Sequence, residues 1–317
     1  MVAFRLKSLA LALALALPFY VEAARAQVAA PQDPPIDVES LMETVRTLSA
    51  PVYEGRRTGS AGNAKARTWI SEQLRRTGLV ATRSNLEIPF KFNRNSETYE
   101  GVNLAATCAG RGAADNGAMV ITAHYDHVGV RDGALYPGAD DNASGVAVLI
   151  ELARHCRRSP WMHDAIFVAL DAEELGLQGA RAFVAAPPIP RERIAINVNL
   201  DMVSRSAARE LYVAGTYHRP TLKSVLEPIA ANAPIKLLFG HDRPKQPASG
   251  HDDWTMQSDH GAFHAAGIPF IYFGVEDHPD YHKPTDTADK IDKGFFGQVA
   301  ETIRAAITAL DRALPVR

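Results

Sequence analysis

The stretch AIFVALDAEELG, residues 165–176, joins a run of apolar residues to three carboxylates. An apolar run of this length, without alternating polar residues, is typical of a strand that is buried on both faces of a sheet. Asp171, Glu173 and Glu174 follow the run, and acidic groups at the end of a buried strand are costly unless something neutralises them. The stretch therefore indicates a buried sheet and raises the question of what balances its charge.

Similar apolar runs lie on both sides of this stretch, and segments of helical pattern separate them. The nearest runs are AMVITA (118–123) and IAINVNL (194–200), and a helix is predicted over 143–156 between the first run and the opening stretch. This alternation predicts the α/β class with a largely parallel sheet. Further strands are predicted near 86–90, 102–107 and 210–215, and further helices from Asp37, over 62–77, 177–186, 220–232 and 292–314.

Polar residues follow three of the apolar runs. His124 comes after residues 118–123, Asp201 comes after residues 194–200, and the three carboxylates come after the opening run. The carboxyl ends of neighbouring strands in an open α/β sheet share one crevice, where ligands bind. These side chains are therefore expected to meet there.

A further acidic segment, PGADDNASG, precedes the helix predicted from residue 143. One of Asp140, Asp141 and Asn142 is expected to cap that helix, because their side chains accept hydrogen bonds from free backbone N–H groups. Capping explains one side chain and leaves the other acid unaccounted for.

The convergence of carboxylates, with no Lys or Arg inside these motifs, predicts a bound metal ion. Bare charges do not persist in a crevice of low dielectric constant. Histidine nitrogen and carboxylate oxygen are the ligands expected for Zn²⁺, with Co²⁺ or Mn²⁺ as substitutes. Structural zinc sites favour thiolates, and no cysteine lies in these motifs, so the pattern favours an open, catalytic site. The chain contains neither a G-x-S-x-G nucleophile elbow nor a G-x-x-x-x-G-K-[ST] phosphate loop.

Six motifs in this order resemble those of peptidase family M28, the co-catalytic di-zinc aminopeptidases. The resemblance runs from EGRRTGSAG at Glu54 to the C-terminal helix. It implies a three-layer α/β/α sandwich around a mixed, mostly parallel sheet. The motifs are AHYDHVG (123–129), GADDNASG (138–145), DAEELGLQGA (171–180), NLDMV (199–203), SDHGAFHAAGIP (258–269) and DYHKPTDT (280–287).

The resemblance also implies the ligands of two zinc ions. One ion would be held by His124, Asp141 and Asp201, and the other by Asp141, Glu174 and His282, so that Asp141 bridges the two. Within the crevice, the metal ions would then neutralise Glu174 and the other ligand carboxylates.

Two further residues take catalytic roles from the resemblance. Asp126, two residues after His124, matches the acid that orients the His ligand. Glu173 matches the general base, which removes a proton from a water shared by the two metals and returns it to the leaving amine. The resemblance implies that the resulting hydroxide, shared by the two metals, would attack the peptide carbonyl and release an N-terminal residue.

The N-terminus predicts export. Residues 1–26 combine Arg5 and Lys7, an apolar stretch and an A-x-A cleavage site, which together are typical of a secretory signal peptide. The apolar stretch is well short of the ~20 residues that a membrane span requires. A linker over 27–36 and a single peptidase domain over 37–317 are expected to follow, in the periplasm or outside the cell.

The remaining composition limits the partners. The formal net charge is -2, with Lys and Arg scattered along the chain, which gives no basic footprint for nucleic acid. Peptides are the expected substrates, no membrane contact is expected after signal cleavage, and nothing in the sequence indicates an oligomeric state. The only cysteines, Cys108 and Cys156, could pair in an oxidising compartment or remain two separate buried thiols.

Three alternatives stay open. A carboxypeptidase of the same superfamily would use a cation for the substrate carboxylate, for which Arg205 or Arg243 could serve. A glutaminyl cyclase resembles a one-metal site, and a non-catalytic binding protein would have lost ligands, whereas all five ligand positions are present here. Tyr281, beside the predicted ligand His282, could donate to the oxyanion or simply pack.

Overall fold

The computed structural model describes residues 34–113, 116–244 and 252–315. The signal peptide and most of the linker predicted from the sequence lie outside these residues. Within them, no helix combines the length and the apolar character that crossing a membrane requires.

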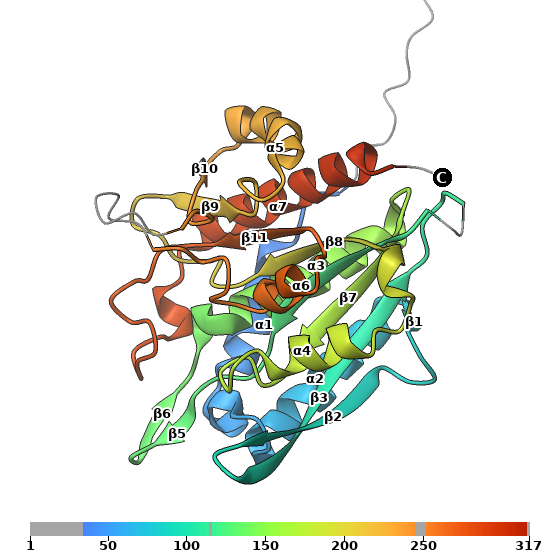
Figure 1. Ribbon diagram of the computed structural model, residues 1–317. Helices are drawn as coiled ribbons and strands as arrows, with labels where there is room; N and C mark the ends of the chain where they lie inside the picture. Colours follow the sequence, from blue (N-terminus) through green and yellow to red (C-terminus); the bar gives the residue numbers. More distant parts are fainter. Residues whose placement is uncertain (1–33, 114–115, 245–251, 316–317) are drawn as a thin grey trace, which may run out of the picture. The chain divides into compact units, whose positions relative to one another are not determined.

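A nine-stranded mixed sheet forms the centre of the described part of the chain (Figure 1). The strand order is β1-β3-β7-β4-β8-β11-β9-β10, and β2 pairs with β3. The four central strands β7, β4, β8 and β11 are parallel, whereas β3 and β9 join this group antiparallel. The strands are β1 (Val80–Ala81), β2 (Glu87–Arg94), β3 (Glu97–Cys108), β4 (Ala118–His124), β7 (Asp164–Leu170), β8 (Ile194–Leu200), β9 (Glu210–Ala214), β10 (Lys236–Phe239) and β11 (Phe270–Gly274), with a separate hairpin of β5 (Gly129–Arg131) and β6 (Ala134–Tyr136).

Helices cover both faces of this sheet. On one face pack α1 (Val38–Leu48), α2 (Ala61–Arg76), α3 (Gly145–Arg158), α5 (Pro220–Asn232) and α7 (Lys293–Ala313), and on the other α4 (Gln178–Ala185) and α6 (His260–Ala265). Short helical segments, labelled η, lie between these elements: η1 (Pro51–Arg56), η2 (Ala139–Ser144), η3 (Arg191–Arg193) and η4 (Ala288–Lys290). The α/β class and the three-layer arrangement expected from the sequence are confirmed.

The central strands are buried on both faces, as their apolar runs predict. Ile121 of β4 packs in the larger hydrophobic core under α3 and α7, whereas its neighbour Val120 packs in the smaller core under α4 and α6. Successive side chains of a strand point to opposite faces, so both must be apolar here.

The helix termini follow the sequence closely. Asp37 caps α1, and its carboxylate accepts hydrogen bonds from the backbone N–H groups of Glu39 and Ser40. At the start of α3, the side-chain oxygen of Asn142 accepts a hydrogen bond from the backbone N–H of Gly145 at 2.9 Å.

Cys108 and Cys156 form a disulfide between the end of β3 and α3. The disulfide decides between the two alternatives that the sequence left open for these cysteines.

Candidate metal centre

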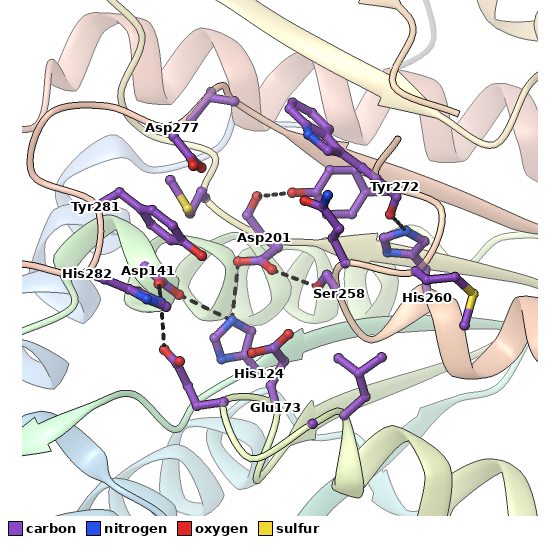
Figure 2. Close-up of a pocket in the computed structure, with 18 of the residues that line it drawn as sticks. His124, Asp141, Glu173, Asp201, Ser258, His260, Tyr272, Asp277, Tyr281 and His282 are labelled. Carbon is purple, nitrogen blue, oxygen red and sulfur yellow. Dashed lines mark hydrogen bonds and ion pairs between the residues drawn. The ribbon is translucent and has the colours of Figure 1, made fainter. Parts of the chain in front are cut away.

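Three neighbouring parallel strands deliver polar side chains to one edge of the sheet. His124 is the last residue of β4, the carboxylates of residues 171–174 follow β7, and Asp201 follows β8. Asp141 arrives from η2 and His282 from the loop after β11. The structure therefore brings the five predicted ligands together, and Figure 2 shows four of them labelled around one pocket.

A first cluster forms around His124. Its Nε2 lies 3.4 Å from Asp141 Oδ1 and 3.2 Å from Asp201 Oδ1. The second oxygen of Asp201 accepts a hydrogen bond from Ser258 Oγ at 2.7 Å, which fixes the orientation of this carboxylate. His124, Asp141 and Asp201 are all buried.

A second cluster forms on the other oxygen of Asp141. Oδ2 lies 3.0 Å from His282 Nε2, which in turn lies 3.3 Å from Glu174 Oε1. Asp141 thus directs one oxygen to each cluster, as a bridging carboxylate would. His127 also joins this cluster, with Nδ1 2.8 Å from Glu174 Oε1.

His127 was not among the residues predicted from the sequence. The matched pattern H-x-D ends at Asp126, and nothing in it assigns a role to the next residue. The available signal was the segment HYDH itself, in which a second histidine follows His124 by three residues.

The two clusters fit zinc ions. Bonds of about 2.0–2.1 Å in a tetrahedral site place neighbouring donor atoms about 3.3 Å apart, which is close to the separations above. The carboxylates of both clusters also favour positive charge. Burial lowers the pKa of His124, but the carboxylates of Asp201 and Glu173 outweigh burial and raise the pKa of His124 well above its ordinary value. For His282, burial is likewise outweighed by Asp141 and Glu174, which raise its pKa to about 10.

Glu173 lies beside the first cluster and its carboxylate faces the pocket (Figure 2). Burial, followed by the nearby carboxylates of Asp259 and Asp201, raises the pKa of Glu173 well above its ordinary value despite the proximity of His124. Glu174 differs sharply: burial and Asp141 act to raise its pKa, but hydrogen bonds with His127 and His282 lower it to about 2. Adjacent residues therefore have opposite protonation tendencies.

Asp126 supports the site differently from the simple orienting contact expected. The shorter contact of His124 Nδ1 is to the main-chain oxygen of Asp126, at 3.2 Å, and the carboxylate lies 3.6 Å away. That carboxylate instead accepts from the backbone N–H groups of Glu173 at 3.0 Å and Glu174 at 3.3 Å. Asp126 therefore positions both glutamates as well as the histidine.

Asp171, the remaining carboxylate of the opening stretch, lies outside both clusters. Burial and nearby Asp126 raise its pKa to about 6 despite its hydrogen bonds. Its carboxylate accepts hydrogen bonds from Thr58 Oγ1, Asn63 Nδ2, Tyr125 Oη and the backbone N–H groups of Val102 and Ala172.

Arg56 is a buried cation that the sequence motifs did not reveal. Its guanidinium donates to the backbone oxygens of Tyr125, Leu48, Pro137 and Gly138 at 2.7–2.8 Å. It therefore ties together the segments that follow β4 and precede η2. These segments adjoin His124 and Asp141, which belong to the two clusters.

The clusters form the floor of a cavity of about 470 Å³. Tyr281 stacks on His282 with ring centroids 4.0 Å apart, and its hydroxyl faces the cavity (Figure 2). Arg205 pairs with Asp280 at 2.6 Å and lies outside the lining, and Arg243 also lies outside it. Other lining side chains are Arg94, Arg181, Trp254, Met256, His260 and Asp277.

Comparison with known proteins agrees with this arrangement. The family model of peptidase family M28 matches residues 103–307. The chain is 34% identical over 202 residues to aminopeptidase YwaD of Bacillus subtilis, and 28% identical over 232 residues to the probable lipoprotein aminopeptidase LpqL of Mycobacterium tuberculosis. These matches cover 60% and 65% of this chain, but only 40% and 45% of the two relatives.

Solved structures show the same fold at low identity. A zinc aminopeptidase from Bacillus subtilis superimposes with a TM-score of 0.69 at 19% identity, covering 87% of this chain and 96% of that one. A glutaminyl cyclase from Bacteroides thetaiotaomicron superimposes with a TM-score of 0.70 at 17% identity, covering 87% and 99%. The fold is thus shared by two different activities. Since the family model covers most of the chain, including both clusters, this protein belongs to peptidase family M28.

Proposed function

We propose that this protein is an exported zinc-dependent aminopeptidase with a two-metal centre. The observation that carries the proposal is that two clusters of nitrogen and oxygen donors share Asp141 beside an unliganded Glu173. His124, Asp141 and Asp201 would hold one zinc ion, and Asp141, Glu174 and His282 the other. Bound zinc ions would lower the pKa of a coordinated water and polarise the peptide carbonyl.

Glu173 would act as the general base. Its carboxylate would take a proton from the attacking water and return it to the nitrogen of the leaving amine, as a general base does. Asp126 holds the backbone of Glu173, so that the carboxylate stays directed at the pocket. The Tyr281 hydroxyl would donate a hydrogen bond to the developing oxyanion.

The amino end of a peptide suits this pocket. Asp277 lines it, and a carboxylate attracts a cationic α-amine. Arg205, which a carboxypeptidase could use, is engaged by Asp280 and Asp286. Arg94 and Arg181 also line the pocket, so binding of a substrate carboxylate is a competing hypothesis that the experiment below must distinguish.

Export is supported by the disulfide between Cys108 and Cys156. Disulfides form and persist in oxidising compartments such as the periplasm and the exterior of the cell. One relative is named a probable lipoprotein aminopeptidase, which is consistent with an exported chain.

The test is a product analysis by mass spectrometry. The zinc-loaded protein is incubated with one mixed-sequence peptide in free and N-acetylated forms. Stepwise loss of residues from the free amino end, blocked by acetylation, is the expected result. Loss from the carboxyl end of both forms would establish a carboxypeptidase and refute the proposal, as would the absence of hydrolysis.

A further inference from the structure

His127 is the buried residue next to the site that the proposed mechanism does not use. It follows the metal-binding segment after β4, and its side chain is fully buried. Its ring packs against Gly138, where an added Cβ would lie 2.5 Å from the ring carbon Cδ2. The absence of a side chain at Gly138 therefore provides the space that the histidine ring occupies.

The polar contacts of His127 all lie on the Nδ1 side of the ring. Nδ1 is 2.8 Å from Glu174 Oε1 and 3.6 Å from Asp141 Oδ2. Among the residues that the structure describes, Nε2 has no hydrogen-bond partner. A buried histidine is thus directed with one nitrogen at two carboxylates of the second cluster.

The four donors of this cluster have the spacing of a complete zinc site. His127 Nδ1, Asp141 Oδ2, Glu174 Oε1 and His282 Nε2 all lie within 4.8 Å of one another. The four measured contacts are 2.8, 3.0, 3.3 and 3.6 Å, with a mean near the edge of about 3.3 Å expected for tetrahedral zinc. Within the described parts of the chain, the first cluster offers three donors, from His124, Asp141 and Asp201.

We propose that His127 is a fourth protein ligand of the second metal, so that the two sites are unequal. The second site has four protein side chains as ligands and therefore binds its ion more tightly than the first. The first site, with three protein ligands, keeps an open position, as catalytic zinc sites do. This inference rests on the proposed zinc centre and concerns its asymmetry.

The alternative role for His127 is to donate a hydrogen bond that orients Glu174. Loss of such an outer partner typically lowers metal affinity about 10–100-fold. Loss of a direct ligand should cost more. The side chain of glutamine can donate a hydrogen bond to Glu174 but is a poor zinc ligand, so His127→Gln separates the two roles.

The experiment measures zinc content per chain against graded chelator concentrations, without any activity assay. The wild type should release two zinc ions in two steps. His127→Ala and His127→Gln should both weaken the tighter step by more than about 100-fold and leave the weaker step unchanged. Ser258→Ala, which removes the contact to Asp201 of the first cluster, is the matched control and should shift only the weaker step.

Three outcomes are informative. Wild-type affinity in both His127 variants, or in His127→Gln alone, would refute the ligand role while leaving the proposed function intact. Failure of the wild type to bind zinc would instead refute the proposed function. As a control, the metal-free variants should unfold thermally at the temperature of the metal-free wild type, so that a loss of zinc cannot be ascribed to misfolding.

Discussion

At the scale of single residues, the site depends on the difference between Glu173 and Glu174. The two are adjacent in the chain, yet Glu174 contacts two histidines of the second cluster, whereas Glu173 faces the pocket without contacting a donor of either cluster at ion-pair distance. The sequence predicted this division of roles through the family resemblance. The structure adds that burial and neighbouring acids raise the pKa of Glu173, whereas hydrogen bonds with His127 and His282 lower the pKa of Glu174.

Glu173→Gln should retain zinc and lose nearly all turnover. The amide keeps the size of the side chain but cannot accept the proton, and loss of a general base costs roughly 10²–10⁴-fold in rate. Zinc content and kcat, measured on the same preparation, check this prediction. A variant with a near-normal rate would contradict the assignment of the base.

Asp259 gives a prediction of pH dependence for the metal-free protein. Both of its carboxylate oxygens lack a hydrogen-bond partner among the described residues, and burial raises its pKa to about 8. The folded state therefore favours the protonated acid, so stability present at low pH is lost as the pH rises from about 4 to about 8.

Between about pH 5 and about pH 8, the metal-free wild type should lose roughly 4 kcal/mol more free energy of unfolding than Asp259→Asn, at about 1.4 kcal/mol per pKa unit. The amide cannot ionise and so removes this penalty. Denaturant unfolding in the presence of chelator measures the difference. If the free energies of unfolding of the two proteins change equally with pH, ionisation of Asp259 does not destabilise the folded state, and the prediction is wrong.

At the scale of elements, Arg56 joins segments that are distant in the chain. Its guanidinium contacts the end of α1, the segment after β4 and the segment before η2. Arg56→Met should lower the free energy of unfolding by roughly 3–5 kcal/mol, because it leaves buried carbonyl groups without donors. Arg57→Met, at the exposed neighbouring position, is the control and should have little effect in denaturant unfolding. Equal stability of the two variants would contradict the role given to Arg56.

The sequence predicted most elements but not all of them. β8 and α5 have the predicted bounds because their apolar patterns end at clear breaks. The strands that were not predicted are β1, β5, β6, β10 and β11. β11 is a short run of aromatic and β-branched residues after the Gly-Ile-Pro turn, which is itself typical of a buried strand, so this element was predictable from its pattern. The roles of Arg56 and His127 could not be predicted, because burial and contact with distant segments leave no periodic pattern in the sequence.

At the scale of the whole molecule, the disulfide should contribute substantially to stability. It closes a loop with a sequence separation of 48 residues, for which the loss of chain entropy corresponds to about 4 kcal/mol. Replacing both Cys108 and Cys156 by Ser should lower the free energy of unfolding by this amount. Reductant should destabilise the wild type equally and leave the double variant unchanged. Insensitivity of the wild type to reductant would argue against the disulfide.

The proposed function depends on two clusters that share Asp141 and together hold two zinc ions. Anomalous scattering at the zinc absorption edge, measured on crystals grown with zinc, tests it most directly. Two peaks are predicted, one among His124, Asp141 and Asp201, and the other among Asp141, Glu174, His282 and His127. A single peak, or peaks that do not share Asp141, would contradict the account.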